Sequence, residues 1–184
     1  MNTNIKRAVI NDINSDLITC YRTERDYVED LIPVLQEIQA QYYALQDMDA
    51  KREMFMAVRQ RYNEKNLDPI ENTVKFFFLN RTCFSGLYRV NKKDLFNVPC
   101  GKYMQPQICD EDTLRADSEL LKKVEILEGD FENTLLCAKG KTLFYFDPPY
   151  RPLSDTSSFN DYTKEAFNDD SQVRLKKFCD KVLA

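Results

Sequence analysis

The chain has 184 residues, of which 30% are charged and 12% aromatic, so it is long enough for about one globular domain with a sizeable core. Its apolar runs are all shorter than a membrane span, its first residues lack the apolar core of a signal peptide, and its six cysteines form no CxxC pair. The absence of histidine excludes histidine-based triads and histidine general bases. We therefore expect a protein of the reducing cytosol with no metal site and no membrane segment.

The formal net charge of −4 hides an uneven distribution. Residues 72–104 contain six lysines and arginines and a single acid, a net charge of +5, which leaves −9 on the remainder of the chain. A basic segment inside an acidic protein is expected of a local contact with a polyanion. It is also compatible with a solvated face that happens to be basic.

The first predicted strand, residues 8–10, is short and apolar and runs into Asp12. In nucleotide-binding α/β folds an acid at the end of the second strand accepts hydrogen bonds from ribose hydroxyls, and Asp12 could do the same. It could instead cap the helix that is predicted to begin near Ser15 and Asp16.

Three helices are predicted in the stretch that follows. Apolar residues recur at helical spacing in residues 26–43 and again in residues 49–62. Pro33 should start or kink the first of these helices. The third helix should begin at Asp68, where acid, proline and glutamate stand in the order of a capped first turn, and should stop before Gly86. Their apolar stripes are expected to form the core: Tyr27, Leu31, Val34, Leu35, Ile38 and Tyr42; Met54, Phe55, Val58 and Tyr62; Val74, Phe76, Phe77 and Leu79.

Two further strands are predicted to lead into acids. Residues 124–131 form an apolar run that reaches Asp130, and residues 143–146 read as a buried strand followed directly by Asp147. Together with Asp12, these acids would lie at one edge of a sheet, where open α/β proteins bind ligands.

A stiff elbow is predicted at Asp147, Pro148, Pro149 and Tyr150. The prolines have no N–H to donate and restrict the backbone on either side. The elbow would present a carboxylate, free carbonyls and a tyrosine ring, which suit a flat ligand with N–H groups, such as an amino-bearing nucleobase. The same four residues could equally be only a rigid exit turn.

Residues 80–91 and 96–103 mix arginine, lysine, asparagine and serine with aromatic residues and two of the four glycines, without a regular period. This pattern predicts a loop or hairpin excursion. Arginine commonly binds guanine through two hydrogen bonds, and lysines hold phosphates. Taken alone, the stretch could equally be a structural loop that needs glycine turns.

In this combination the sequence resembles the Dam-type (D12 class) DNA adenine methyltransferases, which transfer a methyl group from S-adenosylmethionine to the exocyclic amine of adenine in duplex DNA. The resemblance rests on residues 11–18 (NDINSDLI), residues 79–91, residues 96–103, and the DPPY sequence at 147–150 with the RPLS that follows. These segments run in the family's order and span nearly the whole chain. DPPY alone is moderately specific, and together with the two central segments it is a strong signature.

The resemblance implies an α/β fold: a partial Rossmann-like methyltransferase sheet with a mostly helical DNA-recognition insertion. Residues 1–22 and 120–184 would form the catalytic part, and residues 23–119 the insertion, with the target-recognition segment at about 72–104. The family's cofactor is S-adenosylmethionine, and its partner is double-stranded DNA. A cognate restriction endonuclease of the same system is a further expected partner, in a bacterium, phage or mobile element.

The resemblance also implies a mechanism. The target adenine is flipped out of the duplex, because its amine cannot reach a cofactor from inside the stack. Tyr150 would stack on the flipped ring, while the Asp147 carboxylate and the Pro148 carbonyl would accept hydrogen bonds from the amine, and Pro149 completes the pocket. These bonds draw the nitrogen lone pair toward the methyl donor, which is catalysis by positioning and electrostatics.

Further roles are implied for the cofactor and the DNA. Asp12 would bind the cofactor ribose, Asp130 and Phe131 would lie by its adenine ring, and Asp147 also borders the cofactor. Arg89 would contact a guanine, which implies a recognition site that contains GAT or GATC. The implied DNA-contacting residues are Ser85, Leu87, Arg89, Asn91, Lys92, Lys93, Pro99 and Lys102.

The sequence departs from the family's pattern at both ends. The FxGxG cofactor loop should precede Asp12, but only eleven residues do and none is glycine, and the last strands of the sheet are missing. We expect a fragment that by itself binds S-adenosylmethionine weakly and has little or no activity. Ser85, where related enzymes often carry asparagine, leaves the recognition site open. Two alternatives also stay open: a DNA-binding remnant or half of a split methyltransferase, and methylation of another planar amine, in RNA or a glutamine side chain.

Overall fold

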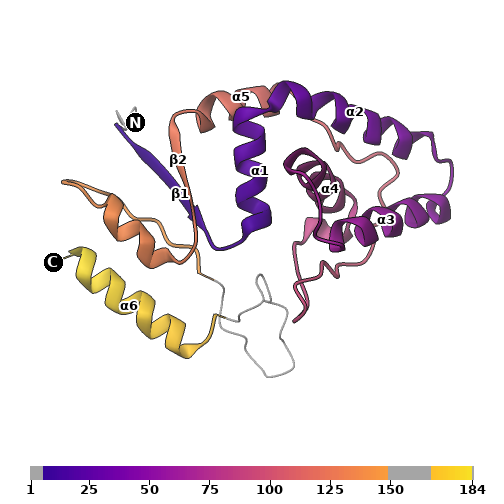
Figure 1. Cartoon of the computed structure of the whole chain (residues 1–184). Coiled ribbons are helices and arrows are strands. Elements are labelled where there is room, and N and C mark those ends of the chain that lie inside the picture. Colours follow the sequence, from indigo (N-terminus) through magenta and orange to yellow (C-terminus); the bar gives the residue numbers. More distant parts are fainter. Residues whose placement is uncertain (1–5, 149–166, 184) are drawn as a thin grey trace.

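The computed structural model describes residues 6–148 and 167–183, and its elements fall into two parts joined by a pair of helices (Figure 1). The helical part contains α2, α3 and α4, and the other part contains the two strands, η2 and α6, with α1 and α5 between them. The elements in chain order are β1 (Ala8–Asp12), α1 (Ser15–Asp26), α2 (Val28–Ala44), α3 (Met48–Asn63), α4 (Pro69–Thr82), η1 (Phe84–Gly86), α5 (Glu111–Leu121), β2 (Val124–Glu128), η2 (Phe131–Cys137) and α6 (Asp169–Leu183).

The sheet of the described residues consists of β1 and β2, which run parallel. Ala8 pairs with Val124 and Asp12 with Glu128, so both strands end at the same edge. The backbone N–H of Gly129 extends this pairing by donating to the Asp12 carbonyl at 2.9 Å. Neighbouring parallel strands need a crossover connection, and here residues 13–123 provide it. The strand predicted at residues 8–10 is therefore confirmed, and the one predicted at residues 124–131 is confirmed as far as Glu128.

The prediction of a buried strand at residues 143–146 was wrong. These residues have no regular secondary structure, and Leu143 and Tyr145 are 93% and 86% exposed. Their neighbours Phe144 and Phe146 stack on each other and pack edge-on against Phe178 of α6. The segment thus keeps the alternation of a strand, but a strand also needs a hydrogen-bonded neighbour, and within the described residues β1 and β2 pair only with each other.

The helices begin where short polar side chains cap them. The side chains of Asn14, Asp47, Asp68 and Asp110 accept backbone N–H groups in the first turns of α1, α3, α4 and α5. The predicted start of α4 is confirmed, with Asp68 as cap and proline at the first helical position. The cap of α1 is Asn14, so the alternative in which Asp12 caps this helix was wrong.

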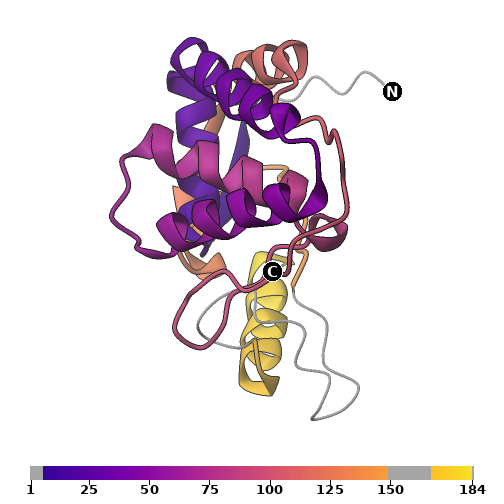
Figure 2. The ribbon, with the colours of Figure 1, turned by 90° about the vertical axis from the view of Figure 1, so that its right-hand side faces the viewer.

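The hydrophobic core lies in the helical part, where α4 packs against α1, α2 and α3 (Figure 2). The predicted stripes supply seven of its fifteen buried residues in the described part of the chain, including the fully buried Leu35 and Phe55, whereas the fully buried Phe78 of α4 was not among the predicted core residues. Two members of the stripe on α2 face outward instead, since Tyr27 and Val34 are 52% and 39% exposed. The helix begins at Val28 and contains Pro33, so this proline does not start it.

None of the helices in the described part of the chain is long and apolar enough to cross a membrane. All six cysteines are free thiols. Within the same residues, no group of three or more histidine, cysteine or acidic side chains could hold a metal ion.

Candidate functional site

The carboxyl edge of the parallel pair carries Asp12 in a half-buried position. Its Oδ1 accepts the backbone N–H of Asn14 at 2.7 Å. Burial raises the pKa of the Asp12 carboxyl, and the N–H groups of Asn14 and Ile13 partly offset that rise. The edge therefore holds a carboxylate that is fixed by the backbone around it and still has acceptor positions for hydroxyl donors.

Asp130 lies at the same edge, because it follows Gly129, whose N–H is bonded to the end of β1. Its carboxylate caps η2 through the N–H of Glu132 at 2.9 Å and binds Arg174 of α6 at 2.9 Å. The Arg174 guanidinium also lies 5.2 Å from the centre of the Phe131 ring. The structure therefore brings Asp12 and Asp130 together as predicted, and places an arginine that the sequence did not indicate beside Asp130 and Phe131.

Asn11 is a second residue at this edge that the sequence analysis missed. Its Nδ2 donates to the Gly129 carbonyl at 2.9 Å, which ties the two strand ends together. Its Oδ1 is buried and finds no partner among the described residues. Buried acceptors without a donor are rare, so this oxygen marks an unsatisfied position at the edge.

The third predicted acid, Asp147, is exposed and follows the stacked pair Phe144 and Phe146. Pro148 is half-buried. Pro149 and Tyr150 lie outside the described residues, so the predicted elbow stays a prediction.

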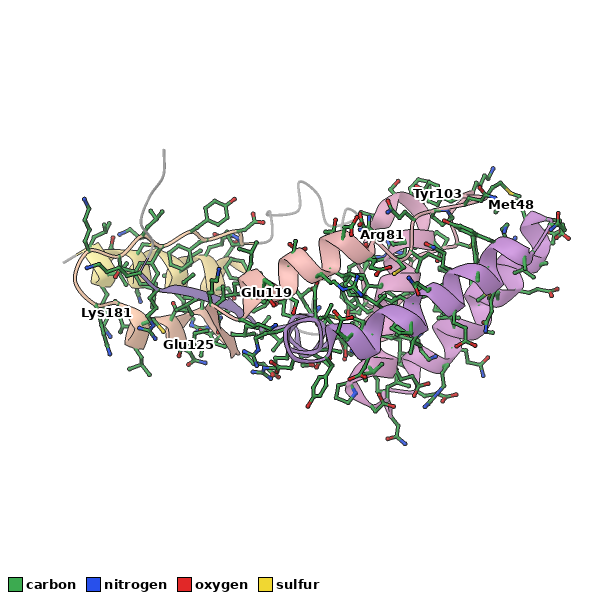
Figure 3. All side chains as sticks on the ribbon, turned by 90° about the horizontal axis from the view of Figure 1, so that it is seen from above. Met48, Arg81, Tyr103, Glu119, Glu125 and Lys181 are labelled. Atoms are coloured by element: carbon green, nitrogen blue, oxygen red, sulfur yellow. The ribbon has the colours of Figure 1, made fainter. Side chains whose placement is uncertain are left out.

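Residues 83–100 of the basic segment form an excursion with two antiparallel bridges, one at its base and one further out. Cys83 pairs with Cys100, with Phe84 N bonded to the Pro99 carbonyl at 2.9 Å, and Val90 pairs with Phe96 further out. Gly101 is required at the base, because a Cβ there would lie 2.8 Å from the Cys83 carbonyl oxygen. The predicted hairpin excursion is therefore confirmed. Figure 3 shows the labelled Arg81 and Tyr103, which flank it, together in the helical half, away from Glu125 and Lys181.

The turn next to the base of this excursion, residues 84–87, presents large apolar side chains to solvent. Phe84 and Leu87 are 57% and 51% exposed, and Ser85 and Gly86 between them both have positive φ, at 55° and 62°. The Asn80 side chain holds the turn by donating to the Gly86 carbonyl at 2.8 Å. Phe84 was missed as a candidate, although an aromatic residue beside a left-handed turn in a basic segment is a signal for it.

Arg89 contacts Asn97 through both its side chain and its backbone. Its Nε donates to Asn97 Oδ1 at 2.7 Å, and Asn97 N donates to the Arg89 carbonyl at 3.1 Å. The role of Asn97 was not predicted, because the sequence shows an asparagine at this position but does not show that it lies against Arg89.

The other DNA candidates occupy the rim of the excursion. Ser85, Leu87, Lys92, Lys93, Pro99 and Lys102 are all exposed. The Asn91 side-chain oxygen is used within its own turn, where it accepts from Lys93 N at 2.8 Å and Leu95 N at 3.2 Å. The residues predicted to contact DNA thus lie on or beside one excursion. Asn91 also stabilises the turn of that excursion through its side-chain oxygen.

A parallel strand pair with acids at its carboxyl edge, joined through helices to an exposed basic excursion, is the combination expected of an enzyme that acts on a nucleic acid. Comparison with known proteins makes the class specific. The sequence matches the D12 class N6 adenine-specific DNA methyltransferases over residues 1–183, and the chain belongs to this family.

Individual relatives agree with this assignment. The chain is 45% identical over 179 residues to the type II methyltransferase M.MjaIII of Methanocaldococcus jannaschii, covering 96% of this chain and 62% of that protein. It is 39% identical over 176 residues to the type II methyltransferase M1.LlaDCHI of Lactococcus lactis subsp. cremoris, covering 93% and 59%. A DNA adenine methylase of Vibrio cholerae is 30% identical over 181 residues, with 98% and 62% covered. The chain therefore spans about three fifths of the length of these relatives.

Proposed function

We propose that this chain carries the cofactor edge and the target-reading part of an enzyme that transfers a methyl group from S-adenosylmethionine to adenine N6 in duplex DNA. The proposal is carried by the parallel register of β1 and β2, which puts Asp12 and Asp130 at one edge in a chain of the adenine-specific family. In open α/β sheets that edge is where ligands bind.

The residues at the edge fit the cofactor. Asp12 is a half-buried acceptor suited to ribose hydroxyls, and Asp130 and Phe131 offer a carboxylate and a ring face to the adenine. The buried, unpaired Oδ1 of Asn11 is a further acceptor at this edge. When bound, S-adenosylmethionine supplies the methyl group.

We further propose that β1 and β2 belong to a Rossmann-like sheet, with residues 1–22 and 120–184 as the catalytic part and residues 23–119 as the recognition insertion. The order of elements supports this division, because the helical part lies within the crossover between β1 and β2. Both borders fall inside helices, α1 and α5, so the two parts share these helices as a rigid joint.

The substrate adenine would be flipped into a pocket at residues 147–150. Asp147 and the Pro148 carbonyl accept hydrogen bonds from its amine, Tyr150 stacks on its ring, and Pro149 fixes the turn. Hydrogen bonds that localise the nitrogen lone pair stabilise the transition state by electrostatics, so the chemistry needs no histidine. Asp147 also borders the cofactor.

Arg89 would read a guanine within a GAT or GATC site, because its side chain is already oriented by Asn97. Ser85, Leu87 and Pro99 are exposed on the same excursion, and the exposed Lys92, Lys93 and Lys102 would hold phosphates. The exposed Phe84 adds an apolar surface to the same turn.

A methyl-transfer assay tests the proposal. Tritiated S-adenosylmethionine is mixed with the chain and a duplex that contains GATC, and the product nucleosides are separated. We expect little label from this chain by itself, all of it in N6-methyl-2′-deoxyadenosine, with none from a duplex already methylated at this site and at least about a hundredfold less with Asp147→Ala. A folded wild-type chain that binds the duplex without transferring label would instead support the second candidate, a DNA-binding remnant or one half of a split enzyme.

A further inference from the structure

The strongest polar cluster that the proposed mechanism does not use is centred on Asp16, in the first turn of α1. Its Oδ2 accepts hydrogen bonds from Tyr62 OH at 2.8 Å and from Lys65 Nζ at 2.7 Å, and it lies 3.5 Å from Tyr88 OH. The Asp16 side chain is only 17% exposed. Charge-assisted bonds in such a partly buried place are stronger than those of a surface pair.

The three donors come from different parts of the chain. Tyr62 ends the buried face of α3, Lys65 follows this helix, and Tyr88 belongs to the basic excursion, one residue before Arg89. Asp16 itself follows Asp12 by four residues, beyond the Asn14 cap. One carboxylate therefore joins the edge of the sheet, the helical part and the excursion.

Tyr88 is fixed from several sides. Its ring packs against Phe76 and Phe96 with centroid distances of 5.2 and 5.8 Å. Burial raises the pKa of its hydroxyl, and hydrogen bonds with Tyr62 and Asn14 work against that rise. Because a single peptide separates Tyr88 from Arg89, the place of the arginine depends on where this hydroxyl is anchored.

Lys65 makes a second connection to the excursion. Besides Asp16 it binds Asp94 at 3.3 Å, in the turn beyond Arg89. Lys65 and Asp94 both have positive φ, 58° and 59°, which costs free energy for residues with a side chain. Two strained residues that bind each other and the same cluster indicate that the geometry of this turn is held in place.

We propose that Asp16 is a positioning residue for sequence reading, which fixes the excursion and thereby Arg89 relative to the edge that carries Asp12. This inference rests on the proposed function, since it concerns how the same site discriminates between DNA sequences. Asp16 orients the reading turn and does not touch the base. Its loss should therefore reduce the discrimination between sequences and leave the phosphate-driven affinity for DNA nearly unchanged.

The test uses the full chain and two duplexes, one with GATC and one with a single base pair of that site replaced. Asp16→Asn removes the charge, and Tyr88→Phe removes only the hydroxyl and keeps the ring. Asp112→Asn is the matched control for the acid, since Asp112 holds the same second position in α5 and is exposed. Tyr43→Phe is the control for the hydroxyl, because Tyr43 OH donates to the Pro106 carbonyl at 2.8 Å, away from this cluster.

For Asp16→Asn and Tyr88→Phe we expect the ratio of the two dissociation constants to fall by roughly threefold to tenfold, with the affinity for the altered duplex within about twofold of wild type. Both controls should keep the wild-type ratio. An unchanged ratio in both variants overturns the inference, as does an equal loss of affinity for the two duplexes that follows a lowered melting temperature. A folded wild-type chain that binds neither duplex overturns the proposed function itself, and this inference with it.

Discussion

The helical region, residues 28–109, and the sheet region, made of β1, β2, η2, residues 142–148 and α6, are held together in different ways. In the described part of the chain, the main core cluster contains fifteen buried residues, nearly all in the helical region, whereas the cluster under the strands contains three, Ile18, Leu121 and Ile126. The sheet region adds the contacts of Phe178 with three aromatic rings, and exposed ion pairs. The basic excursion is thus anchored on a large core, and the acids of the sheet edge on a small one.

The two regions should contribute unequally to the free energy of unfolding. Burial of apolar area is the dominant favourable term in folding, while exposed ion pairs contribute little. The helical region should therefore set the global stability, and the sheet region should respond to mutations locally. Four substitutions test that division.

Phe78→Ala should cause the largest loss. Phe78 is fully buried on α4 and packs edge-on against Tyr42 at 5.6 Å. Its removal leaves a cavity in the main core, so we expect the free energy of unfolding to fall by about 3–5 kcal/mol in a urea titration. Leu120→Ala, at a position that is 59% exposed, is the control and should change it by less than about 0.5 kcal/mol.

Glu24 reports on the packing of α1 against α5, which lie between the two regions, because it lies on α1 and its carboxyl is repelled by that of Asp117 on α5. It is 7% exposed, and burial, followed by the charge of Asp117, raises the pKa of its carboxyl to about 7 from an ordinary 4.5. The folded state binds the proton of the Glu24 carboxyl more tightly than the unfolded state does. The contribution of this proton to the free energy of unfolding is therefore fully present below pH 4.5 and is lost as the pH rises through 7.

Glu24→Gln should therefore raise the free energy of unfolding at pH 8 by up to roughly 3 kcal/mol and flatten its dependence on pH between 5 and 8. The control is Glu53→Gln on the exposed face of α3. Equal pH profiles for wild type and Glu24→Gln in denaturant titrations would show that this carboxyl is not buried as described.

Phe178→Ala should separate the regions. Phe178 is 5% exposed and contacts Phe131, Phe144 and Phe146, so its loss should release α6 from η2. We expect hydrogen exchange to accelerate in α6 at least about tenfold while α4 keeps its protection. Equal acceleration in both helices would mean that the two regions unfold as one unit.

Arg174→Ala should have the smallest effect. Its ion pairs with Asp130 and Glu132 are exposed, with 46% of the arginine side chain accessible. We expect a change below about 1 kcal/mol in the free energy of unfolding, which thermal melts at low and high salt can measure. A larger loss would show that ion pairs contribute more to the stability of the sheet region than its small core suggests.

The sequence predicted what depends on neighbours in the chain. The helix starting at Asp68 and Pro69 was found because a cap and a first-turn proline act within four residues. About half of the buried core was found because helical periodicity is local, and the strands that lead to Asp12 and Asp130 because apolar runs stop near these acids. Phe78 was missed because the continuous apolar run around it does not show which side faces the core.

Features that depend on distant partners were not predictable. Residues 143–146 have the composition of a strand, yet a strand exists only with a partner, and these side chains pack on Phe178 instead. The same limit hid the Arg89–Asn97 bond, the position of Arg174 beside Asp130, and the meeting of three donors at Asp16. Each joins residues whose types are visible in the sequence but whose proximity is created by the fold.

The proposed division, with sequence reading in the excursion and chemistry in the sheet region, can be tested by comparing Arg89→Ala with Asp147→Ala on the same two duplexes. Dissociation constants for the GATC and altered duplexes are measured together with methyl transfer to the GATC duplex. We predict that Arg89→Ala loses the difference between the duplexes, and that Asp147→Ala keeps it while transfer falls at least about a hundredfold. Discrimination lost in Asp147→Ala, or wild-type discrimination retained in Arg89→Ala, would contradict the account.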